Sequence, residues 1–403
     1  MNSKQLSLYR EMLKYTGLAI GIGIIVGIID AVFGRVLIGI TNFRSANPMV
    51  LIPFLSIAGL IIIFLYRTFS KEALKGMTLI FETGFGENER IPKRLIPLVM
   101  FTTWITHLFG GSAGREGVAV QLGATVAHTV GKKVKIENGG RVLLLTGMAA
   151  GFGGLFQTPI AATFFAMEVL VAGALQYEAL LPALVAAYVS SSTSHLLGLE
   201  KFAVDLHVSF QVDAIFILKL VVISIVFGLT GGVFAAGLEA VKDVMRKKCP
   251  DSYLRIFIVG ICLSVVFLVL SKGRYSGLGT NLISAAFTDG KIYAYDWILK
   301  LALTVLTLAA GFQGGEVTPL FAIGASLGVV LGGLFGLPVM FVAALGYIAV
   351  FSSATKTLLA PIFIGVEVFG TEYVLYFAVV CVIAYLFNGS RTIYHLQRVY
   401  KFK

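Results

Sequence analysis

The sequence predicts an all-α protein that crosses a membrane many times, and its composition and apolar runs are the observations that predict it. Of its 403 residues, 57% are hydrophobic and only 13% are charged, whereas soluble proteins carry roughly 25% charged residues. Apolar runs recur along the chain, at 17–29, 51–66, 215–229 and 256–270. At about 20 residues per crossing, the length allows roughly ten to thirteen full crossings, or more elements if several are half-helices. This composition excludes a soluble enzyme.

Basic residues gather in the connections between apolar runs and at the two chain ends. The net charge is +11, from 32 Lys and Arg against 21 Asp and Glu. The basic groups are Lys4, Arg10 and Lys14; Lys132, Lys133 and Lys135; Arg246, Lys247 and Lys248; and Arg398, Lys401 and Lys403. Such groups are typical of loops on the cytoplasmic side of a membrane, against anionic lipid. They predict a multi-pass protein of the plasma membrane, or cell inner membrane, with cytoplasmic termini and no nucleic-acid partner.

The chain ends and the cysteines restrict the architecture further. The first 14 residues are polar and lead into an apolar stretch without a small-residue cleavage site, so no removable signal peptide is expected. The last apolar segment ends near Phe387, and no cytoplasmic regulatory domain is expected after it. Cys249, Cys262 and Cys381 suggest neither a disulfide framework nor a metal site. We therefore expect no metal and no cofactor.

Two glycine-rich segments predict helices that are broken at membrane depth. Residues 110–117 (GGSAGREG) and 311–319 (GFQGGEVTP) are too polar and too flexible for the middle of a spanning helix. Irregular backbone at that depth is tolerated where it lines a cavity. A different pattern, glycine at every fourth position, predicts close contact between two helices. It occurs at Gly324, Gly328, Gly332 and Gly336.

An internal repeat relates two halves of the chain, predicted at 1–200 and 201–403. Three landmarks recur in the same order about 200 positions later, as expected of a duplicated unit. They are 76–80 with 279–283, 114–116 with 314–316, and the pair 158–160 and 167–169 with the pair 360–362 and 366–368. If each half contains an odd number of crossings, the second half is inserted upside down, which is the inverted-repeat plan of secondary transporters.

The two breaks predict an anion site near the middle of the membrane. Apolar runs that can form helices follow both breaks, at 118–130 and 319–334. The N-terminus of a helix carries unpaired amide N–H groups and a partial positive charge, so it attracts anions without a buried Lys or Arg. Two such N-termini, one from each half, would bind an anion between them.

Glu116 and Glu316 stand at equivalent points of the two breaks. A carboxylate at Glu116 competes with a permeating anion for the same donors and leaves them when it is protonated. Glu116 would therefore act as a gate and as a proton carrier; the alternative is that it simply pairs with Arg115. Glu316 is either a second protonatable relay or a group that faces a water-filled cavity.

Four motifs follow one another along the chain: G-R-E-G at 114–117, F-Q-T-P-I at 156–160, G-G-E-V-T-P at 314–319, and a tyrosine, Tyr394, that opens the predicted final helix. They resemble the signature motifs of the CLC family of chloride channels and proton-coupled anion antiporters. The resemblance implies a CLC-type fold of two inverted-topology halves with broken, tilted helices, and a homodimer with a pore in each subunit. It also implies that Glu116 is the gating glutamate and Tyr394 the central tyrosine. The implied anion ligands are the backbone N–H groups of Gly117, Glu316 and Val317.

Departures from the family pattern indicate a particular branch. Residues 76–80 read G-M-T-L-I, where chloride-transporting members carry a motif of the G-S-G-I-P type, and Val118 replaces the usual proline after the gate. Met77 in this place, together with Thr318 in the second break, resembles the fluoride/proton antiporter branch, which exports F⁻ from bacteria in exchange for H⁺. The alternatives are a chloride/proton exchanger or a passive anion channel of the same family.

Physical chemistry gives these residues expected roles. Fluoride is small and strongly hydrated, so its site must supply close donors such as the hydroxyl groups of Thr318 and Tyr394. Met77 either contacts the anion directly or is a flexible apolar plug. Val169 stands where chloride/proton exchangers usually carry an internal proton-transfer glutamate. Protons would then travel on Glu116 itself, assisted by Thr318 or Glu316.

A rival class is an intramembrane serine protease, because residues 110–114 match G-x-S-x-G and His107 lies nearby. That motif is weak without its strand-turn-helix context, and it explains neither Glu116 nor the second break.

Three acidic residues lie in or beside apolar runs. Glu168 and Glu367 occupy matching places in the repeat, so we expect a shared structural role in which each accepts hydrogen bonds from neighbouring backbone. For Asp30 the sequence indicates no particular role.

Overall fold

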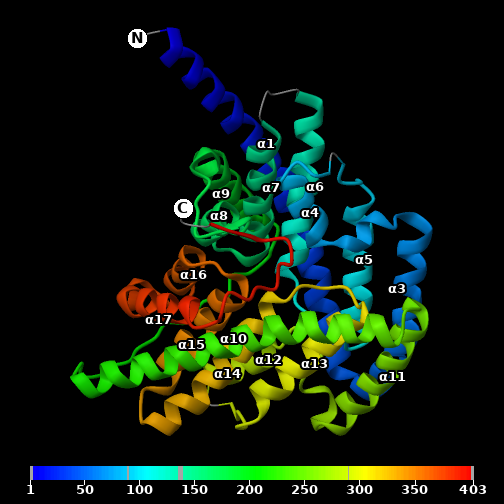
Figure 1. Cartoon of the computed structure of the whole chain (residues 1–403), viewed down its shortest axis with the longest axis vertical. Helices are drawn as coiled ribbons and strands as arrows, with labels where there is room; N and C mark the ends of the chain where they lie inside the picture. Colours follow the sequence, from blue (N-terminus) through cyan, green and yellow to red (C-terminus); the bar gives the residue numbers. More distant parts are fainter. Residues whose placement is uncertain (1–2, 89, 135–138, 289, 401–403) are drawn as a thin grey trace.

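Helices make up nearly all the regular structure of the protein (Figure 1). The computed structural model describes residues 3–88, 90–134, 139–288 and 290–400. The elements of the first half are α1 (Ser3–Ala46), α2 (Pro48–Leu51), η1 (Ile52–Phe54), α3 (Leu55–Phe69), η2 (Glu72–Lys75), α4 (Met77–Gly84), α5 (Leu95–Leu108), α6 (Glu116–Val134), α7 (Gly139–Phe156), α8 (Pro159–Glu168), β1 (Val171–Ala172), η3 (Tyr177–Ala179) and α9 (Leu180–Leu196). Those of the second half are α10 (Ala214–Lys248), α11 (Ser252–Val269), η4 (Ser271–Gly273), α12 (Thr280–Ala286), α13 (Asp296–Ala310), α14 (Val317–Phe335), α15 (Val339–Thr355), α16 (Leu359–Phe369), η5 (Thr371–Tyr373), α17 (Val374–Leu386) and β2 (Arg398–Val399).

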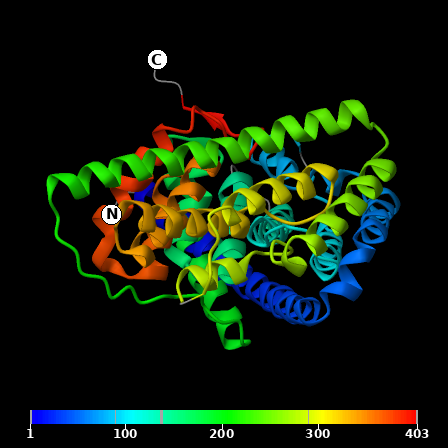
Figure 2. The same cartoon turned by 90° about the horizontal axis from the view of Figure 1, so that it is seen from below.

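Long and short apolar helices are mixed. Five helical segments of the described residues are long and apolar enough to cross a membrane alone: Leu13–Ala46, Pro48–Phe69, Ala214–Lys248, Ser252–Val269 and Val317–Phe335. The longest of those in the second half, α10, extends across the width of the molecule in Figure 2. Other apolar helices, such as α5 and α16, have only 10–17 residues, fewer than the roughly 20 that a crossing needs. The short helices confirm the prediction of broken helices. Of the two arrangements that the length allows, the structure has the one with additional half-helices.

Glycines allow two pairs of helices to pack backbone to backbone. In the first half α6 lies along α7, and in the second half α14 lies along α15. A Cβ on Gly123 would collide with the Gly147 carbonyl oxygen, and one on Gly324 would collide with that of Gly346. This confirms the close contact predicted from the glycine spacing. Gly336 differs, because it ends α14 with a left-handed φ of 62° and faces open space.

Two cavities open at opposite ends of α11. The first, called here the tyrosine cavity, has a volume of about 450 Å³, and its wall includes Tyr394, Met77 and Ser252, the first residue of α11. The second, called the arginine pocket, has a volume of about 360 Å³, and its wall includes Arg44 and Ser271–Gly273, which follow the end of α11. An α-helix of this length spans roughly 27 Å. The two cavities therefore open on opposite faces of the molecule.

Equivalent helices of the two halves run in opposite directions. In the first half α4 begins with Met77 at the tyrosine cavity, whereas its counterpart α12 begins with Thr280 at the arginine pocket. The end of α5 lies beside the arginine pocket, because Arg44 Nη1 donates to the His107 carbonyl (2.9 Å), whereas its counterpart α13 ends in the wall of the tyrosine cavity. The inverted topology predicted from the repeat is confirmed. The division near residue 200 lies beside the extended segment that joins α9 to α10, and it stays a prediction.

The segment after α17 contradicts one expectation. No helix begins at Tyr394; the described residues beyond α17 form turns and the short strand β2, which pairs in parallel with β1. The Arg398 N–H donates to the Leu170 carbonyl (3.1 Å), and the Gln397 side-chain amide donates to the Val169 carbonyl (2.9 Å). These bonds hold the chain extended, because they satisfy backbone and side-chain groups that a helix would arrange differently.

The predicted basic groups lie mostly at helix ends. Arg246, Lys247 and Lys248 form the last turn of α10, and Lys132 and Lys133 lie in the last turn of α6, where cations complement the helix dipole. Lys135, Lys401 and Lys403 lie outside the described residues, as do the side chains of Lys4 and Arg10.

Candidate functional site

The two glycine-rich breaks meet as a pair of antiparallel backbone hydrogen bonds. The Gly114 N–H donates to the Gly315 carbonyl (2.5 Å), and the Gly315 N–H donates to the Gly114 carbonyl (2.8 Å). A side chain would not fit, because a Cβ on Gly114 would lie 2.9 Å from the Gly315 oxygen and one on Gly314 would lie 2.5 Å from the Ala113 Cβ. The predicted broken backbone is thus confirmed, and it brings the starts of α6 and α14 together.

The Glu116 carboxylate of the first half occupies the N-terminus of α14 in the second half. Its Oε2 accepts hydrogen bonds from the Thr318 Oγ1 (2.5 Å), from the Thr318 N–H (3.1 Å) and from the Arg115 N–H (3.3 Å). The side chain is 1% exposed. A helix N-terminus binds anions through its free N–H groups and its dipole, so Glu116 holds a place that a free anion could take.

The alternative pairing with Arg115 is present but secondary. The Arg115 Nε lies 3.5 Å from the Glu116 Oε1. Neither of these two atoms has a hydrogen-bond partner among the described residues. The stronger contacts of Glu116 are therefore those with Thr318. Among the described residues, its Oε1 remains free to accept a hydrogen bond.

Tyr394 and Met77 lie together in the wall of the tyrosine cavity. The Tyr394 side chain is 5% exposed, and its hydroxyl has no hydrogen-bond partner within the described residues. Its ring stacks on that of Phe81, with centroids 5.3 Å apart, and Met77 is half-buried at the start of α4. An unpaired buried hydroxyl beside a cavity is a donor available to an anion.

Glu316 links the tyrosine cavity to the start of α6. It lines the cavity, and its Oε2 lies 3.6 Å from where a Cβ on Gly117 would stand. Glu316 thus lies where either of its two predicted roles could apply, and both stay predictions. Gly117 and Val317 lie in the first turns of α6 and α14, where helix geometry provides no intrahelical acceptor for an N–H group.

Two features of the site were missed by sequence reasoning. Gln121 follows Gly117 by one turn of α6, lines the tyrosine cavity and carries an Oε1 without a partner among the described residues. The cavity also contains three cations from α10 and α11: Lys242, Arg246 and Arg255. Charged residues at 239, 242, 243 and 246 share one face of α10 by helical spacing, and that pattern could have revealed the stripe.

Glu168 and Glu367 exchange helix caps between the two halves. The Glu168 carboxylate accepts from the N–H groups of Leu358 (3.0 Å), Leu359 (3.1 Å) and Ala360 (2.8 Å) at the start of α16. The Glu367 carboxylate accepts from the N–H groups of Ile160 (3.3 Å) and Ala161 (2.8 Å) at the start of α8. The predicted structural role of both residues is confirmed.

Asp30 lies among α1, α7 and α9 rather than in the wall of either cavity. It is fully buried, and neither carboxylate oxygen has a partner in the described part of the chain. A Cβ on Gly154 would lie 2.5 Å from the Asp30 Oδ2 and would also collide with the Ser190 Oγ. Glycine at position 154 therefore makes the room for this carboxyl group.

The serine-protease alternative lacks its central contact. The Ser112 Oγ lies 2.8 Å from the Thr304 Oγ1 and accepts from the Lys300 Nζ (2.9 Å). The two ring nitrogens of His107 contact backbone carbonyl oxygens at 2.8 and 3.0 Å. A nucleophile and its base must lie within hydrogen-bond reach, and these partners keep Ser112 and His107 otherwise engaged.

Comparison with known proteins gives concordant results. The family model described as "Voltage gated chloride channel" matches residues 58–389. The chain is 35% identical to the chloride/fluoride channel protein of Pseudomonas syringae pv. tomato, over 98% of this chain and 89% of that protein. Its structure matches that of a CLC-type fluoride/proton antiporter with a TM-score of 0.96 and 53% identity, over 97% of this chain and 99% of that one. A slow cyanobacterial Cl⁻/H⁺ antiporter shares the fold, with a TM-score of 0.82 and 20% identity over 94% and 96% of the two chains.

Both glycine-rich breaks lie inside the part of the chain that the family model covers. The match therefore includes the paired backbone, Glu116 and the start of α14, which form the centre of the site. The chain is a helical membrane protein that belongs to the voltage gated chloride channel family, the CLC family.

Proposed function

We propose that this protein is a proton-coupled fluoride antiporter, which exports F⁻ from the cytoplasm in exchange for H⁺. The observation that carries the proposal is the Glu116 carboxylate on the hydroxyl and amide donors of Thr318. A carboxylate held in this way marks a place where a small anion can bind. The similarity to a structure described as a CLC-type fluoride/proton antiporter supports the choice of ions.

Competition for one set of donors provides the coupling. As a carboxylate, Glu116 holds the Thr318 hydroxyl and N–H groups and blocks the anion. Protonation removes the negative charge and turns one oxygen into a donor, so the hold of Glu116 on the α14 N-terminus weakens and the anion binds there. When Glu116 gives up its proton, the carboxylate returns and displaces the anion. Each exchange of anion for glutamate therefore moves a proton.

The fluoride path begins in the tyrosine cavity. Cations from α10 and α11 raise the local concentration of anions there. The Tyr394 hydroxyl, which has no hydrogen-bond partner among the described residues, is a donor that the anion meets in this cavity. The backbone N–H groups of Gly117, Glu316 and Val317 follow at the starts of the two helices, and the donors of Thr318 complete the site after Glu116 has left.

The choice of fluoride rests on close, hydroxyl-rich contact. Fluoride is released from its water shell only if strong donors replace that water, and the Thr318 hydroxyl, which donates to the Glu116 carboxylate, is a donor of that kind. Met77 lines the approach as a flexible apolar group. Its thioether has no hydrogen-bond donor and cannot replace the water around an anion. The site therefore favours an anion that reaches the hydroxyl and amide donors directly.

The proton path differs from that of chloride/proton exchangers. Val169 is fully buried and non-ionisable, so it cannot accept a proton where such exchangers usually carry an acid. We assign the cytoplasmic step to Glu316, which lies in the cavity wall beside Gly117. Glu116 releases its proton to Glu316 there, and the Thr318 hydroxyl assists by donating to the carboxylate that results.

The proposal includes the assembly and its location. We infer a homodimer with a pore in each subunit, in the inner or plasma membrane of a bacterium, with both termini cytoplasmic. The basic last turn of α10 lies at the end of that helix where the tyrosine cavity opens, which supports a cytoplasmic position for this face. Sedimentation in detergent tests the dimer, because it would give twice the 43.2 kDa mass of the chain.

Efflux from liposomes tests the function. Wild-type protein is reconstituted with internal fluoride or chloride, and anion efflux and external pH are followed with and without a protonophore. We expect faster fluoride than chloride efflux, with proton uptake that accompanies it. Faster chloride efflux would favour a chloride/proton exchanger. Fluoride efflux without proton movement would favour a passive channel, the second candidate, which the description of the Pseudomonas relative as a channel supports.

A further inference from the structure

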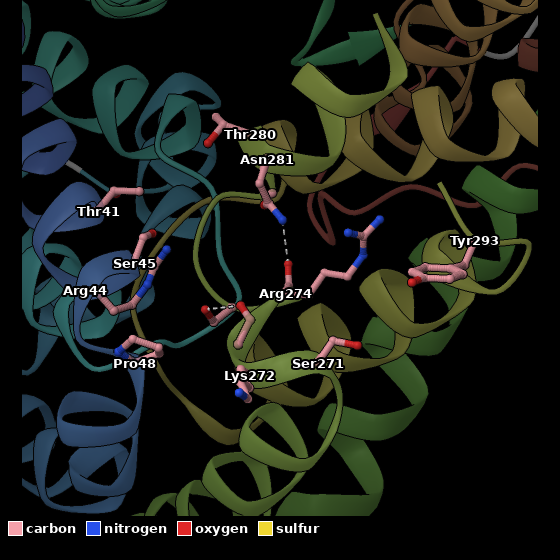
Figure 3. A pocket seen from close by; sticks show the side chains of 13 residues that line it. Thr41, Arg44, Ser45, Pro48, Ser271, Lys272, Arg274, Thr280, Asn281 and Tyr293 are labelled. Carbon is pink, nitrogen blue, oxygen red and sulfur yellow. Dashed lines mark hydrogen bonds between the residues drawn. The ribbon is translucent and has the colours of Figure 1, made fainter. Parts of the chain in front are cut away.

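The arginine pocket has no part in the proposed transport path. It lies on the face opposite the tyrosine cavity, between the end of α1 and the segment that joins α11 to α12 (Figure 3). Its wall carries three cationic side chains, Arg44, Lys272 and Arg274, and no Asp or Glu of the described residues. The wall of the tyrosine cavity, by comparison, carries acids and bases together. The arginine pocket therefore carries an excess of positively charged side chains.

Only one of the three cations is neutralised nearby. Arg274 pairs with Asp296, with an Nη2–Oδ2 distance of 2.6 Å and an Nε–Oδ1 distance of 3.2 Å. Arg44 and Lys272 have no acidic partner within 4.0 Å in the described ranges. Arg44 is nevertheless buried, with only 5% of its surface exposed, and its Nη1 donates a hydrogen bond to the His107 carbonyl. A buried guanidinium without a counter-ion is costly, and a negative ligand would relieve that cost.

A buried lysine lies behind the pocket wall. Lys300 is fully buried, and its Nζ donates to the Gly277 carbonyl (2.7 Å), to the Ser112 Oγ (2.9 Å) and to the Tyr275 carbonyl (3.2 Å). It lies directly behind Gly279, because a Cβ there would stand 3.3 Å from the Nζ.

The neutral groups of the pocket are donors suited to an oxyanion. The lining residues with hydroxyl or amide side chains include Thr41, Ser45, Ser271, Thr280 and Asn281. Figure 3 shows them on both sides of the space, with Arg44 and Ser45 facing Asn281 and the Arg274 segment across it. Several donors spread around about 360 Å³ match a group with several acceptor oxygens, such as a phosphate, better than a single halide ion.

Exposed apolar residues stand next to the lining residues in the sequence. Phe43, Met49, Val50 and Val269 are exposed, and each lies within two positions of a lining residue. They belong to or adjoin α1, α2 and α11, and the segments Leu13–Ala46 and Ser252–Val269 are long and apolar enough to cross a membrane. The pocket therefore lies where spanning helices end, at the depth where lipid head groups meet the acyl region.

We propose that the arginine pocket binds the phosphodiester head group of an anionic phospholipid, with Arg44 and Lys272 as the cations that recognise it. The acyl chains of the lipid lie along the exposed apolar faces of α1 and α11. Because α1 belongs to the first half and η4 to the second, the bound lipid joins the two halves at the face opposite the tyrosine cavity. Free phosphate has the same chemistry without the acyl chains, and the test separates the two.

Lipid retention by the full-length protein tests the proposal. Arg44→Gln and Lys272→Asn each remove one cation; asparagine suits position 272 because the φ of Lys272 is 51°. The matched control is Lys93→Asn, which removes an exposed loop cation before α5, at the end of that helix away from Arg44. Phosphatidylglycerol bound to each purified protein is measured by native mass spectrometry. The thermal shift is measured with phosphatidylglycerol, phosphatidylcholine or inorganic phosphate.

We expect phosphatidylglycerol affinity to fall about fivefold for each pocket cation removed, the change expected for one Lys or Arg at a membrane surface. Lys93→Asn should retain the lipid as the wild type does. If Arg44→Gln does not fold, Lys272→Asn alone decides between the outcomes, because Lys272 is exposed. Equal retention by the pocket variants and the control would overturn the proposal. So would an equal thermal shift with phosphatidylcholine, or one with inorganic phosphate alone, which would make the pocket a site for free oxyanions.

Discussion

Glu116 and Glu316 stand at equivalent positions of the two repeated halves, and the fold uses them in different ways. Glu116 is buried, and its carboxylate is held by Thr318 of the other half. Glu316 is partly exposed and lies in the wall of the tyrosine cavity. The difference follows from the residue two positions later: Thr318 offers a hydroxyl group at the start of α14, whereas the equivalent residue of α6 is Val118, which offers none.

The symmetric backbone of the two breaks thus carries an asymmetric site. The two breaks pair through the same two hydrogen bonds, each half giving one donor and one acceptor. One hydroxyl group then decides which helix start receives a carboxylate from the other half. Under the proposed function, this gives the two glutamates successive tasks: one blocks the anion, and the other exchanges protons with the cavity.

The largest expected effect is that of Glu116→Gln. Glutamine keeps the size of the side chain and the acceptor for Thr318, but it cannot carry a proton, so fluoride-driven proton uptake into liposomes should fall to background. Proton flux and fluoride flux are measured together. Glu372→Gln, at an exposed position in η5, is the control and should behave as the wild type. Wild-type proton coupling in Glu116→Gln would contradict the assignment.

Glu316→Gln should slow both ions without separating them. A positioned proton donor or acceptor contributes at least about a hundredfold in rate, so turnover should fall strongly while the ratio of fluoride to proton stays that of the wild type. Glu239→Gln removes the same charge from the same cavity at a side chain that is 66% exposed, and it tests whether cavity charge alone matters. A fluoride leak without protons in Glu316→Gln would mean that Glu316 is part of the gate.

Thr318→Val tests the residue on which the asymmetry rests. Valine has the shape of threonine without its hydroxyl group, and the loss of one hydrogen bond to a charged group weakens binding by about tenfold or more. Fluoride affinity, measured by titration calorimetry, should fall by that amount, and Thr318→Ser should restore most of it. Equal affinities of the valine and serine variants would show that the hydroxyl group does not bind the ion.

Tyr394→Phe should have the smallest effect of the series. The Tyr394 hydroxyl has no partner within the described chain, so its removal leaves no buried group unsatisfied, and the ring stacking on Phe81 persists. Because Tyr394 lies in the wall of the cavity, water can take over its hydrogen bond to the anion. We therefore expect fluoride affinity to fall by only about threefold to tenfold, with stability unchanged in a thermal melt. Tyr177→Phe, at an exposed position, is the control. A large loss of stability would assign a structural role to the hydroxyl group instead.

Much of the fold was predictable from local patterns. Glycine spacing predicted that the helix at 324–336 packs tightly against another helix, because small residues are what allow two backbones to approach; the structure identifies that helix as α15. Polar glycine-rich segments in an apolar chain predicted the breaks, because exposed backbone at that depth must line a cavity. The matching positions of Glu168 and Glu367 predicted their shared role, and the structure adds that each caps a helix of the other half.

Other parts of the site depend on contacts between distant segments, which local patterns do not encode. Tyr394 was expected to open a helix, but pairing of the following residues with β1 holds the chain extended. The place of Gln121 in the cavity depends on how α6 meets the segment before α4. The contact of Glu116 with Thr318 depends on the meeting of two loops that are about 200 residues apart, which an inverted repeat allows but does not dictate.

The exchanged caps of Glu168 and Glu367 have a consequence for how such a chain can be divided. Each half carries the acceptor that the other half needs, so neither half alone satisfies the start of its own α8 or α16. These two helix starts of the repeated halves are capped only when the two halves pack together. A single half would therefore keep one glutamate and one helix start without a partner.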